Sequence, residues 1–281
     1  MARAIDVHIH PPVPGQRLPT DDPETRAYFR SAVSHRSAEE MAEYYAQLDI
    51  FGVLFHSDAE TATGVPPVPN DDIAALVRRY PKQFAGFGSV DPWKGRPALR
   101  EVERCRELGL LGLKFHPQQQ AFYPNDVERC YPIWEAAQRL GLVVLFHTGT
   151  TGVGAGKPGG GGLKLKYARP IPYIDDVAAD FPELMIIMAH PSFPWQEEQL
   201  AMLVHKPNVY MDLSGWSPKY FSPLLVQYAK TLAQDKVMFG SDYPVISPER
   251  WLNDFDALGV EDTVRQKILI DNARRVLGLD V

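Results

Sequence analysis

The sequence predicts an α/β protein built as a single (β/α)8 barrel, the TIM-barrel fold, over residues 1–281. Three observations support this fold. Eight short apolar segments recur along the chain, amphipathic segments separate them, and polar side chains gather where the apolar segments end. The apolar segments are residues 4–10, 50–56, 84–90, 112–116, 142–147, 184–190, 208–214 and 236–242. Uninterrupted apolar strands of this length are typical of a parallel sheet that is buried on both faces.

The segments between these strands have helical spacing. We expect helices over residues 96–108, 126–140 and 171–181, and stop signals follow them at Gly109, Gly141 and Pro182. Alternating strands and helices over this length match a barrel, but an open doubly wound sheet has the same alternation. The glycine-rich segment 152–162 is predicted to be a loop within the same domain.

Composition narrows the class of protein. The hydrophobic fraction is 45% and the charged fraction 23%, which are ordinary values for a globular domain. A formal net charge of −6 without a Lys/Arg cluster argues against nucleic acid as a partner. No apolar run is long enough to span a membrane, and no signal-peptide region precedes the first strand, so we expect a cytoplasmic protein. Cys105 and Cys130 are expected to be reduced thiols.

Polar residues at the strand ends favour the barrel over the open sheet. Six of the eight histidines lie in or at the carboxyl end of a predicted strand, and Asp242 ends the eighth; the histidines are His8, His10, His56, His116, His147 and His190. In a barrel all strand carboxyl ends open on one face, where active sites are built. These side chains are therefore predicted to converge. His35 and His205 are expected on the surface.

His8 and His10 are two residues apart on the first strand. Their side chains point to the same side, with Cα atoms about 6.5–7 Å apart. This spacing suits two imidazole ligands of one metal ion, although such a pair taken alone is equally compatible with surface or core histidines. His147, His190 and Asp242 on the same rim favour the metal site.

Four motifs, in chain order, resemble the amidohydrolase superfamily. They are Ile-Asp-Val-His-Ile-His at residues 5–10, Leu-Phe-His-Thr-Gly at 145–149, Met-Ala-His-Pro at 188–191 and Phe-Gly-Ser-Asp-Tyr-Pro at 239–244. More narrowly, the sequence resembles the amidohydrolase-related branch. That branch includes aminocarboxymuconate semialdehyde decarboxylase, non-oxidative aromatic acid decarboxylases and dicarboxylate lactonases. The resemblance extends over essentially the whole chain.

The resemblance implies a metal centre. Its ligands would be His8, His10, His147 and Asp242, and its metal one Zn²⁺, with Mn²⁺ as an alternative. His190 would be the catalytic base or proton shuttle, with direct contact to the metal as a further alternative, and Asp242 would take part in the same proton transfers. A divalent ion lowers the pKa of bound water toward about 7, which supports this chemistry independently. The resemblance also implies a homodimer.

Lys114, near the end of the fourth strand, leaves the number of metals open. Some superfamily members carry a carboxylated lysine there that bridges two metals. An ion pair inside the barrel or a bond to a substrate carboxylate is the preferred alternative, because the motifs resemble the single-metal branch. His116 shares the face of Lys114 and is also a candidate substrate contact.

Further substrate contacts are predicted at the rim. The loop 152–162 can be a mobile lid, with Lys157 or Arg169 reaching an anionic substrate, or an ordinary solvated loop. Trp216 can stack on a flat substrate, although such aromatic residues also pack against neighbouring chains. His56 can contact substrate or serve a structural role.

Three functions follow from these residues. The preferred one is a metal-dependent hydrolase, in which a metal-bound water attacks a lactone, ester or amide of a small carboxylated substrate. The alternative is a non-oxidative metal-dependent decarboxylase of an aromatic or dienoic acid. The hydrolase is preferred because the glycine-rich stretch that often follows the strand-six histidine in the decarboxylases is replaced here by residues 191–194, Pro-Ser-Phe-Pro. The third is a catalytically silent metal-binding barrel.

Overall fold

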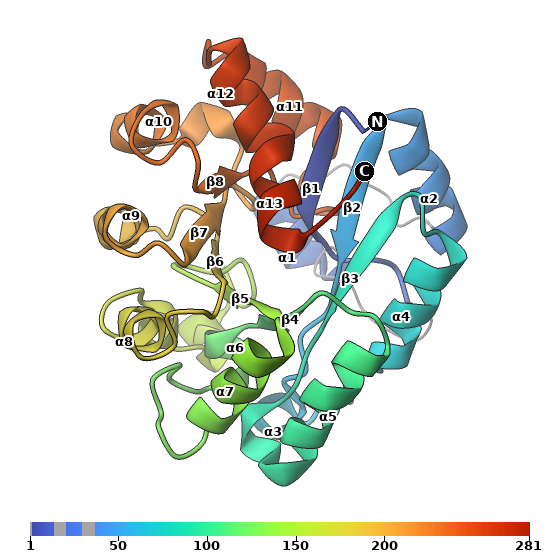
Figure 1. The fold of residues 1–281 in the computed structure, drawn as a ribbon, viewed down its shortest axis with the longest axis vertical. Helices are drawn as coiled ribbons and strands as arrows, with labels where there is room; N and C mark the ends of the chain where they lie inside the picture. Colours follow the sequence, from blue (N-terminus) through green and yellow to red (C-terminus); the bar gives the residue numbers. More distant parts are fainter. Residues whose placement is uncertain (1, 14–20, 30–36) are drawn as a thin grey trace.

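Eight parallel strands form the predicted barrel. The computed structural model describes residues 2–13, 21–29 and 37–281. The strands pair in sequence order, each with the next, which confirms the (β/α)8 fold (Figure 1). They are β1 Ala4–Ile9, β2 Ile50–Leu54, β3 Phe84–Gly88, β4 Gly112–Phe115, β5 Val143–His147, β6 Ile186–Ala189, β7 Val209–Asp212 and β8 Val237–Met238.

The barrel closes between β1 and the chain around β8. The amide of Val7 donates to the carbonyl of Phe239 at 3.0 Å, and the amide of Asp242 donates to the carbonyl of His8 at 3.0 Å. The amide of His10 donates to the carbonyl of Tyr243 at 2.8 Å. Of the predicted strand 236–242, only Val237–Met238 form a regular strand, but the residues after them still hydrogen-bond to β1. These bonds carry Asp242 beside His8 and His10.

A register shift in β1 sets the direction of its polar side chains. The shift lies between Asp6 and Ile9. The buried carboxylate of Asp6 accepts hydrogen bonds from the Tyr45 hydroxyl at 3.0 Å and from the Ser241 amide at 2.8 Å. His8, two residues later, lines the cavity inside the barrel instead. Because a bulge changes the alternation of side chains, the first strand can bond the helix layer at Asp6 and still place two histidines inside.

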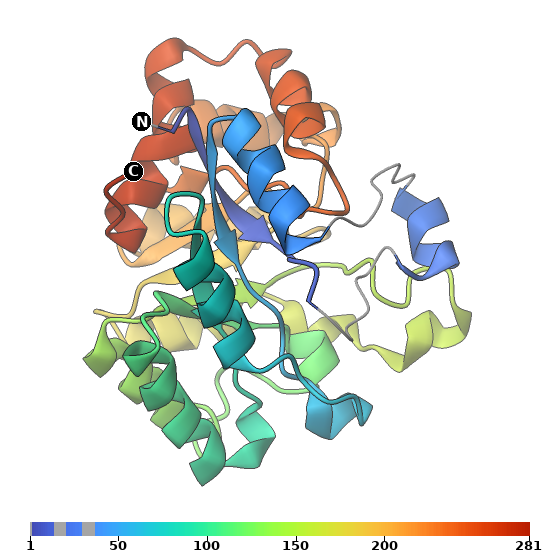
Figure 2. The same ribbon diagram turned by 90° about the vertical axis from the view of Figure 1, so that its right-hand side faces the viewer.

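Helices surround the barrel (Figures 1 and 2). Between the first five strands lie α1 Pro23–Phe29, α2 Ala38–Gln47, α3 Glu60–Thr63, α4 Asn70–Arg79, α5 Arg96–Glu107, α6 Pro117–Gln120 and α7 Tyr131–Leu140. The later connections contain α8 Tyr173–Asp180, α9 Gln196–His205, α10 Pro223–Lys230, α11 Pro248–Asp256, α12 Asp262–Gln266 and α13 Asn272–Leu277. Short 3₁₀ turns are η2 Pro92–Lys94, η3 Pro158–Gly162, η4 Leu165–Ala168 and η5 Pro218–Tyr220, and η6 Lys267–Asp271 is a π-helical segment.

The three predicted helices are present with shifted boundaries. The helix expected over 96–108 is α5, which ends one residue earlier, and Gly109 follows it with a φ of +80°. The helix expected over 126–140 begins only at Tyr131, and the one expected over 171–181 spans 173–180. Pro132 and Pro172 stand at these two starts. Proline fits the first turn of a helix, because its missing N–H would have no intrahelical partner there, so each helix begins close to its proline.

Within the described residues, no helix combines the length and apolar character required to cross a membrane. Cys105 and Cys130 are buried and free, and burial raises the pKa of both thiols. His205 is exposed, whereas His35 lies outside the described residues.

Candidate active site

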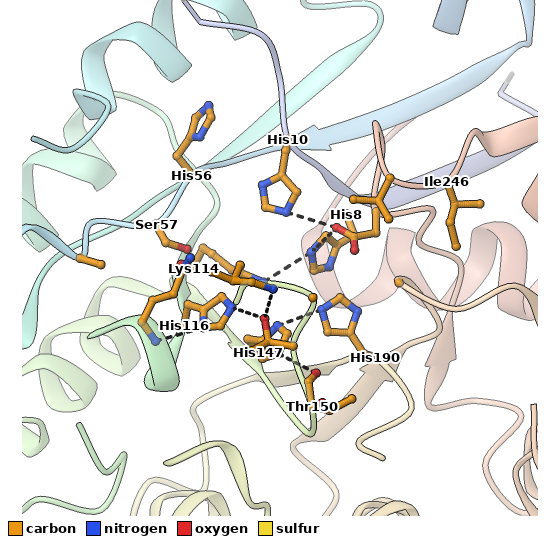
Figure 3. Close-up of a pocket in the computed structure, with 18 of the residues that line it drawn as sticks. His8, His10, His56, Ser57, Lys114, His116, His147, Thr150, His190 and Ile246 are labelled. Carbon is orange, nitrogen blue, oxygen red and sulfur yellow. Dashed lines mark hydrogen bonds and ion pairs between the residues drawn. The ribbon is translucent and has the colours of Figure 1, made fainter. Parts of the chain in front are cut away.

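A cavity of about 1080 Å³ opens at the carboxyl ends of the strands (Figure 3). The structure brings nearly all of the predicted strand-end residues together around it: His8, His10, His56, Lys114, His116, His147, His190, Trp216 and Asp242. They come from the ends of seven of the eight strands or from the loops that follow. The convergence is a consequence of barrel topology, which collects distant segments on one face.

Three of these residues form a compact group of potential metal ligands. The ligand atoms of His8, His10 and Asp242 all lie within 4.8 Å of one another. His10 Nε2 is 3.2 Å from Asp242 Oδ1, and His8 Nε2 is 3.5 Å from the same oxygen. Two imidazoles and a carboxylate are suitable ligands for zinc or a similar divalent ion.

The protonation states of this group suit a divalent ion. Burial lowers the pKa of His8 to about 3, and the neighbouring Lys114 acts in the same direction. Burial alone would raise the pKa of Asp242, but the hydrogen bond from His10 and the nearby histidines bring it to about 2. At neutral pH His8 is therefore neutral and Asp242 ionised, as metal coordination requires. The residues present thus fit the metal that the resemblance implies.

Asp212 orients His8, and the sequence analysis did not identify it. Asp212 ends β7, is fully buried, and its Oδ2 lies 3.1 Å from His8 Nδ1. A carboxylate only accepts, so the proton of the neutral imidazole resides on Nδ1 and the Nε2 lone pair is directed toward Asp242. The Ser214 hydroxyl lies 3.0 Å from His8 Nδ1 and 2.9 Å from His190 Nδ1. The sequence feature that could have identified Asp212 is an acidic residue near the end of a predicted buried apolar strand.

We expect the substitution Asp212→Asn to weaken metal binding by about 10- to 100-fold, as loss of an outer-shell partner of a ligand histidine typically does. An amide cannot enforce the Nδ1-protonated form of His8 as a carboxylate does. Competition with a chromogenic chelator measures the affinity, and Asp235→Asn, which alters a more exposed carboxylate paired with Lys267, is the matched control. Unchanged metal affinity in Asp212→Asn would rule out this orienting role.

His147 and His190 form a second contact within the cavity. His190 Nε2 lies 3.0 Å from His147 Nδ1, and His147 Nε2 lies 3.1 Å from the carbonyl of Thr150. The His147 ring also stacks on His116 with centroids 4.0 Å apart. His147 is outside the group formed by His8, His10 and Asp242, and its role as a metal ligand remains a prediction.

The backbone holds His190 in a constrained position. His190 follows β6 with a φ of +72°, a left-handed conformation that is costly for a residue with a side chain. Gln199 Nε2 donates a hydrogen bond to the His190 carbonyl at 2.8 Å, and the His190 backbone amide donates to Asp212 Oδ1 at 3.3 Å. Gly215 lies beside the ring, where a Cβ would come within 2.6 Å of His190 Nδ1. These contacts hold the imidazole against His147.

Lys114 is buried without a carboxylate partner. Its side chain is 1% exposed, and its Nζ lies 3.5 Å from His8 Nε2 and 4.8 Å from the centre of the Phe55 ring. Within the described part of the chain, no carboxylate oxygen lies within ion-pair distance of this ammonium group. Burial lowers the pKa of Lys114 to about 8. The ion pair considered for Lys114 is thus not formed, which leaves a substrate carboxylate as a natural partner.

The structure does not bring Arg169 into the cavity. Its exposed guanidinium binds the carboxylate of Glu198, the shortest contact being 2.6 Å, and Arg169 is absent from the cavity lining. Because this bidentate pair occupies the guanidinium, the expected substrate contact of Arg169 is not supported. Lys157 likewise lies 3.3 Å from Asp22, where α1 meets the loop after β5 (Figure 2).

His56 and Trp216 do line the cavity, as predicted. His56 Nε2 lies 3.2 Å from the carbonyl of Pro11, and burial lowers the pKa of His56 to about 3. Trp216 has its ring centre 5.9 Å from that of Phe193. Arg250, which the sequence analysis did not single out, also lines the cavity. An isolated arginine in the first turn of a helix gives no indication in the sequence that its side chain lines a cavity.

Comparison with known proteins shows similarity to two decarboxylases and to a TIM-barrel structure. The chain is 22% identical over 263 residues to gamma-resorcylate decarboxylase from Polaromonas sp., covering 80% of this chain and 79% of that protein. It is 26% identical over 242 residues to 2-amino-3-carboxymuconate-6-semialdehyde decarboxylase from Dictyostelium discoideum, covering 75% of this chain and 66% of that protein. An uncharacterized TIM-barrel protein from Bordetella bronchiseptica has a similar structure, with a TM-score of 0.81, 25% identity and 98% of each chain covered.

The family assignment rests on almost the full length of the chain. The sequence profile of the amidohydrolase family matches residues 5–279, from the first strand to the last helix. That range contains every predicted strand-end residue and all four motifs. The chain therefore belongs to the amidohydrolase family.

Proposed function

We propose that this protein is a metal-dependent, non-oxidative decarboxylase of a carboxylated aromatic or dienoic acid. The observation that carries the proposal is the buried ammonium of Lys114, which lies 3.5 Å from His8 in a cavity beside the candidate metal group and has no carboxylate within ion-pair distance among the described residues. An acidic substrate would supply a carboxylate at that distance. Two curated relatives are decarboxylases, which favours this function over the hydrolase that the sequence analysis preferred. The proposal therefore sets aside the preference for a hydrolase that was drawn from residues 191–194.

The metal site is assigned to His8, His10 and Asp242, with His147 as a further candidate. A divalent metal there would supply Lewis acidity, which attracts an acidic substrate and stabilises negative charge that develops on it. Zn²⁺ is the proposed ion and Mn²⁺ the alternative. Asp212 keeps the proton of His8 on Nδ1, so that Nε2 remains available as a ligand.

The remaining residues bind the substrate and move a proton. Lys114 Nζ binds a substrate carboxylate, and His116, His56 and Trp216 form walls around the bound acid. Loss of CO₂ leaves an electron pair on carbon, which must be protonated to complete the reaction. His190 Nε2, bonded to His147 Nδ1 at 3.0 Å, is the proposed proton-transfer atom. Asp242 is the second candidate for this transfer.

Metal analysis and product analysis test the proposal together. Metal-replete protein is incubated with hydroxylated benzoic acids, carboxylated dienoic acids and carboxylated lactones, while CO₂ release and ring opening are followed. CO₂ release with one decarboxylated product per turnover, abolished by chelation and restored by the ion, is the expected result. Ring opening without CO₂ would establish the hydrolase instead. Neither product in a metal-loaded protein would favour the catalytically silent barrel.

The metal count decides the role of Lys114. We expect about one ion per chain; two would make Lys114 a bridging ligand instead of a substrate contact. A homodimer and a cytoplasmic location remain predictions from the sequence.

A further inference from the structure

We propose that Arg250 forms a second anion-binding subsite in the cavity, so that the substrate carries an acidic group in addition to the carboxylate that is lost. This inference rests on the proposed function and narrows its substrate class. The subsite is assigned from three features of the cavity. They are a guanidinium group with no carboxylate partner in the described part of the chain, a described wall almost free of acidic groups, and two cations carried by strands on opposite sides of the barrel or the helices that follow them.

Arg250 differs from the arginines that form ion pairs on the surface. Arg169 and Arg265, for example, bind Glu198 and Asp256. Arg250 lies in the first turn of α11, is partly buried, and has no ion-pair partner among the residues that the structure describes. A guanidinium is always charged at physiological pH and presents donors suited to a carboxylate. Among the described residues, Arg250 therefore lacks the carboxylate partner that Arg169 and Arg265 have.

The charge of the cavity wall also favours a second anion. Of the described residues that line the cavity, Asp242 is the one carboxylate, and it belongs to the candidate metal group. Lys114 and Arg250 contribute cationic side chains. A bound divalent ion would add further positive charge. One carboxylate of a substrate would therefore leave the wall with an excess of cations, whereas a diacid matches it better.

The backbone segments that carry the two cations lie on opposite sides of the barrel. Lys114 lies on β4 and Arg250 on the helix that follows β8, and strands four places apart in a ring of eight are opposite each other. The cavity lining also includes the apolar residues Val245 and Ile246, which shortly precede α11, and Trp216. A ligand that reaches both cations needs two acidic groups separated by a flat or apolar body, as in an aromatic dicarboxylate.

Arg250 is held on a well-anchored helix. The Ser247 hydroxyl caps α11 by accepting from the Arg250 amide at 3.4 Å, and the Ser217 hydroxyl bonds Asp254 in the same helix at 2.5 Å. Ser217 itself lines the cavity after β7. The guanidinium therefore extends from a fixed backbone, which limits the entropy lost when it binds an anion.

Binding of inert acids tests this subsite without any turnover. Calorimetry on the metal-loaded protein compares benzoate with isophthalate and terephthalate, whose two carboxylates differ in spacing. We expect at least one diacid to bind more tightly than benzoate. Arg250→Gln should weaken binding of that diacid by roughly 10- to 100-fold and change benzoate binding less than about twofold. Arg265→Gln is the matched control and should alter neither.

Two results would overturn the inference. One is equal weakening of benzoate and diacid in Arg250→Gln, which would indicate a general effect on the cavity. The other is no change for either diacid. The outcome is separable from the proposed function: selective loss of diacid binding without CO₂ release in any assay would keep the subsite and reject the decarboxylase, and the reverse combination would do the opposite.

Discussion

Replacing His10 by alanine is expected to remove the bound metal and to lower turnover by at least about 1000-fold. The contribution of a catalytic ion is several kcal/mol, and each 1.4 kcal/mol corresponds to a factor of ten in rate. His10 Nε2 contributes to a group whose ligand atoms lie within 4.8 Å of one another, so its loss leaves His8 and Asp242 as an incomplete site. Metal content by elemental analysis and initial rates measure the two effects.

His205→Ala is the matched control for this substitution. His205 is exposed at the end of α9 and lies outside the cavity, so the variant should retain both metal and rate. Circular dichroism of His10→Ala should match that of the parent protein, because the barrel is closed by backbone bonds and an apolar core. A His10→Ala variant that keeps a full complement of metal would contradict the assignment of the ligands.

Replacing His190 by alanine is expected to lower kcat by about 100- to 10,000-fold while leaving the metal content unchanged. This range is typical of the loss of a general acid or base. His190 also forms a second group of potential ligand atoms with His8 and Asp212, but Asp212 is committed to His8 Nδ1, and the proposed metal group is His8, His10 and Asp242. His190 Nε2 lies 3.0 Å from His147 Nδ1, so proton transfer should suffer more than metal retention. Steady-state kinetics and elemental analysis on the same preparation separate the two roles.

Added imidazole provides a more specific readout. The cavity is large enough to admit it, and it should restore part of the activity of His190→Ala in a concentration-dependent manner. A purely structural role for His190 would leave the variant insensitive to imidazole. Wild-type turnover by His190→Ala would remove this residue from the chemistry altogether.

The difference between Arg169 and Arg250 shows where sequence reasoning fails. Both residues follow barrel strands, and the sequence analysis chose Arg169 because it lies near a glycine-rich loop. In the structure, Arg169 forms an ion pair with Glu198 of α9, whereas Arg250 lines the cavity. Which arginine meets a ligand depends on the path of a loop and on a distant carboxylate. Local sequence does not encode either of them.

Asp212 shows a different kind of omission. It lies within the predicted strand 208–214, and in the structure it is the last residue of β7. Its contact with His8 joins residues 204 positions apart. A strand-end position alone indicates proximity to the cavity, but it does not show which ring nitrogen a carboxylate meets. That detail sets the tautomer of a candidate ligand.

The sequence by itself determined the barrel, the common face of the strand-end histidines and Asp242, and the amidohydrolase resemblance. The barrel and the common face follow from alternation and connectivity, because a parallel barrel brings every strand end to one face whatever the details of packing. The resemblance rests on the four short motifs. Only the tertiary structure decided that Lys114 lacks an ion pair, that His147 bonds His190, that Asp212 orients His8 and that Arg250 lines the cavity. Such contacts depend on side-chain directions and on distances of about 3 Å between remote segments, at the scale of a single hydrogen bond.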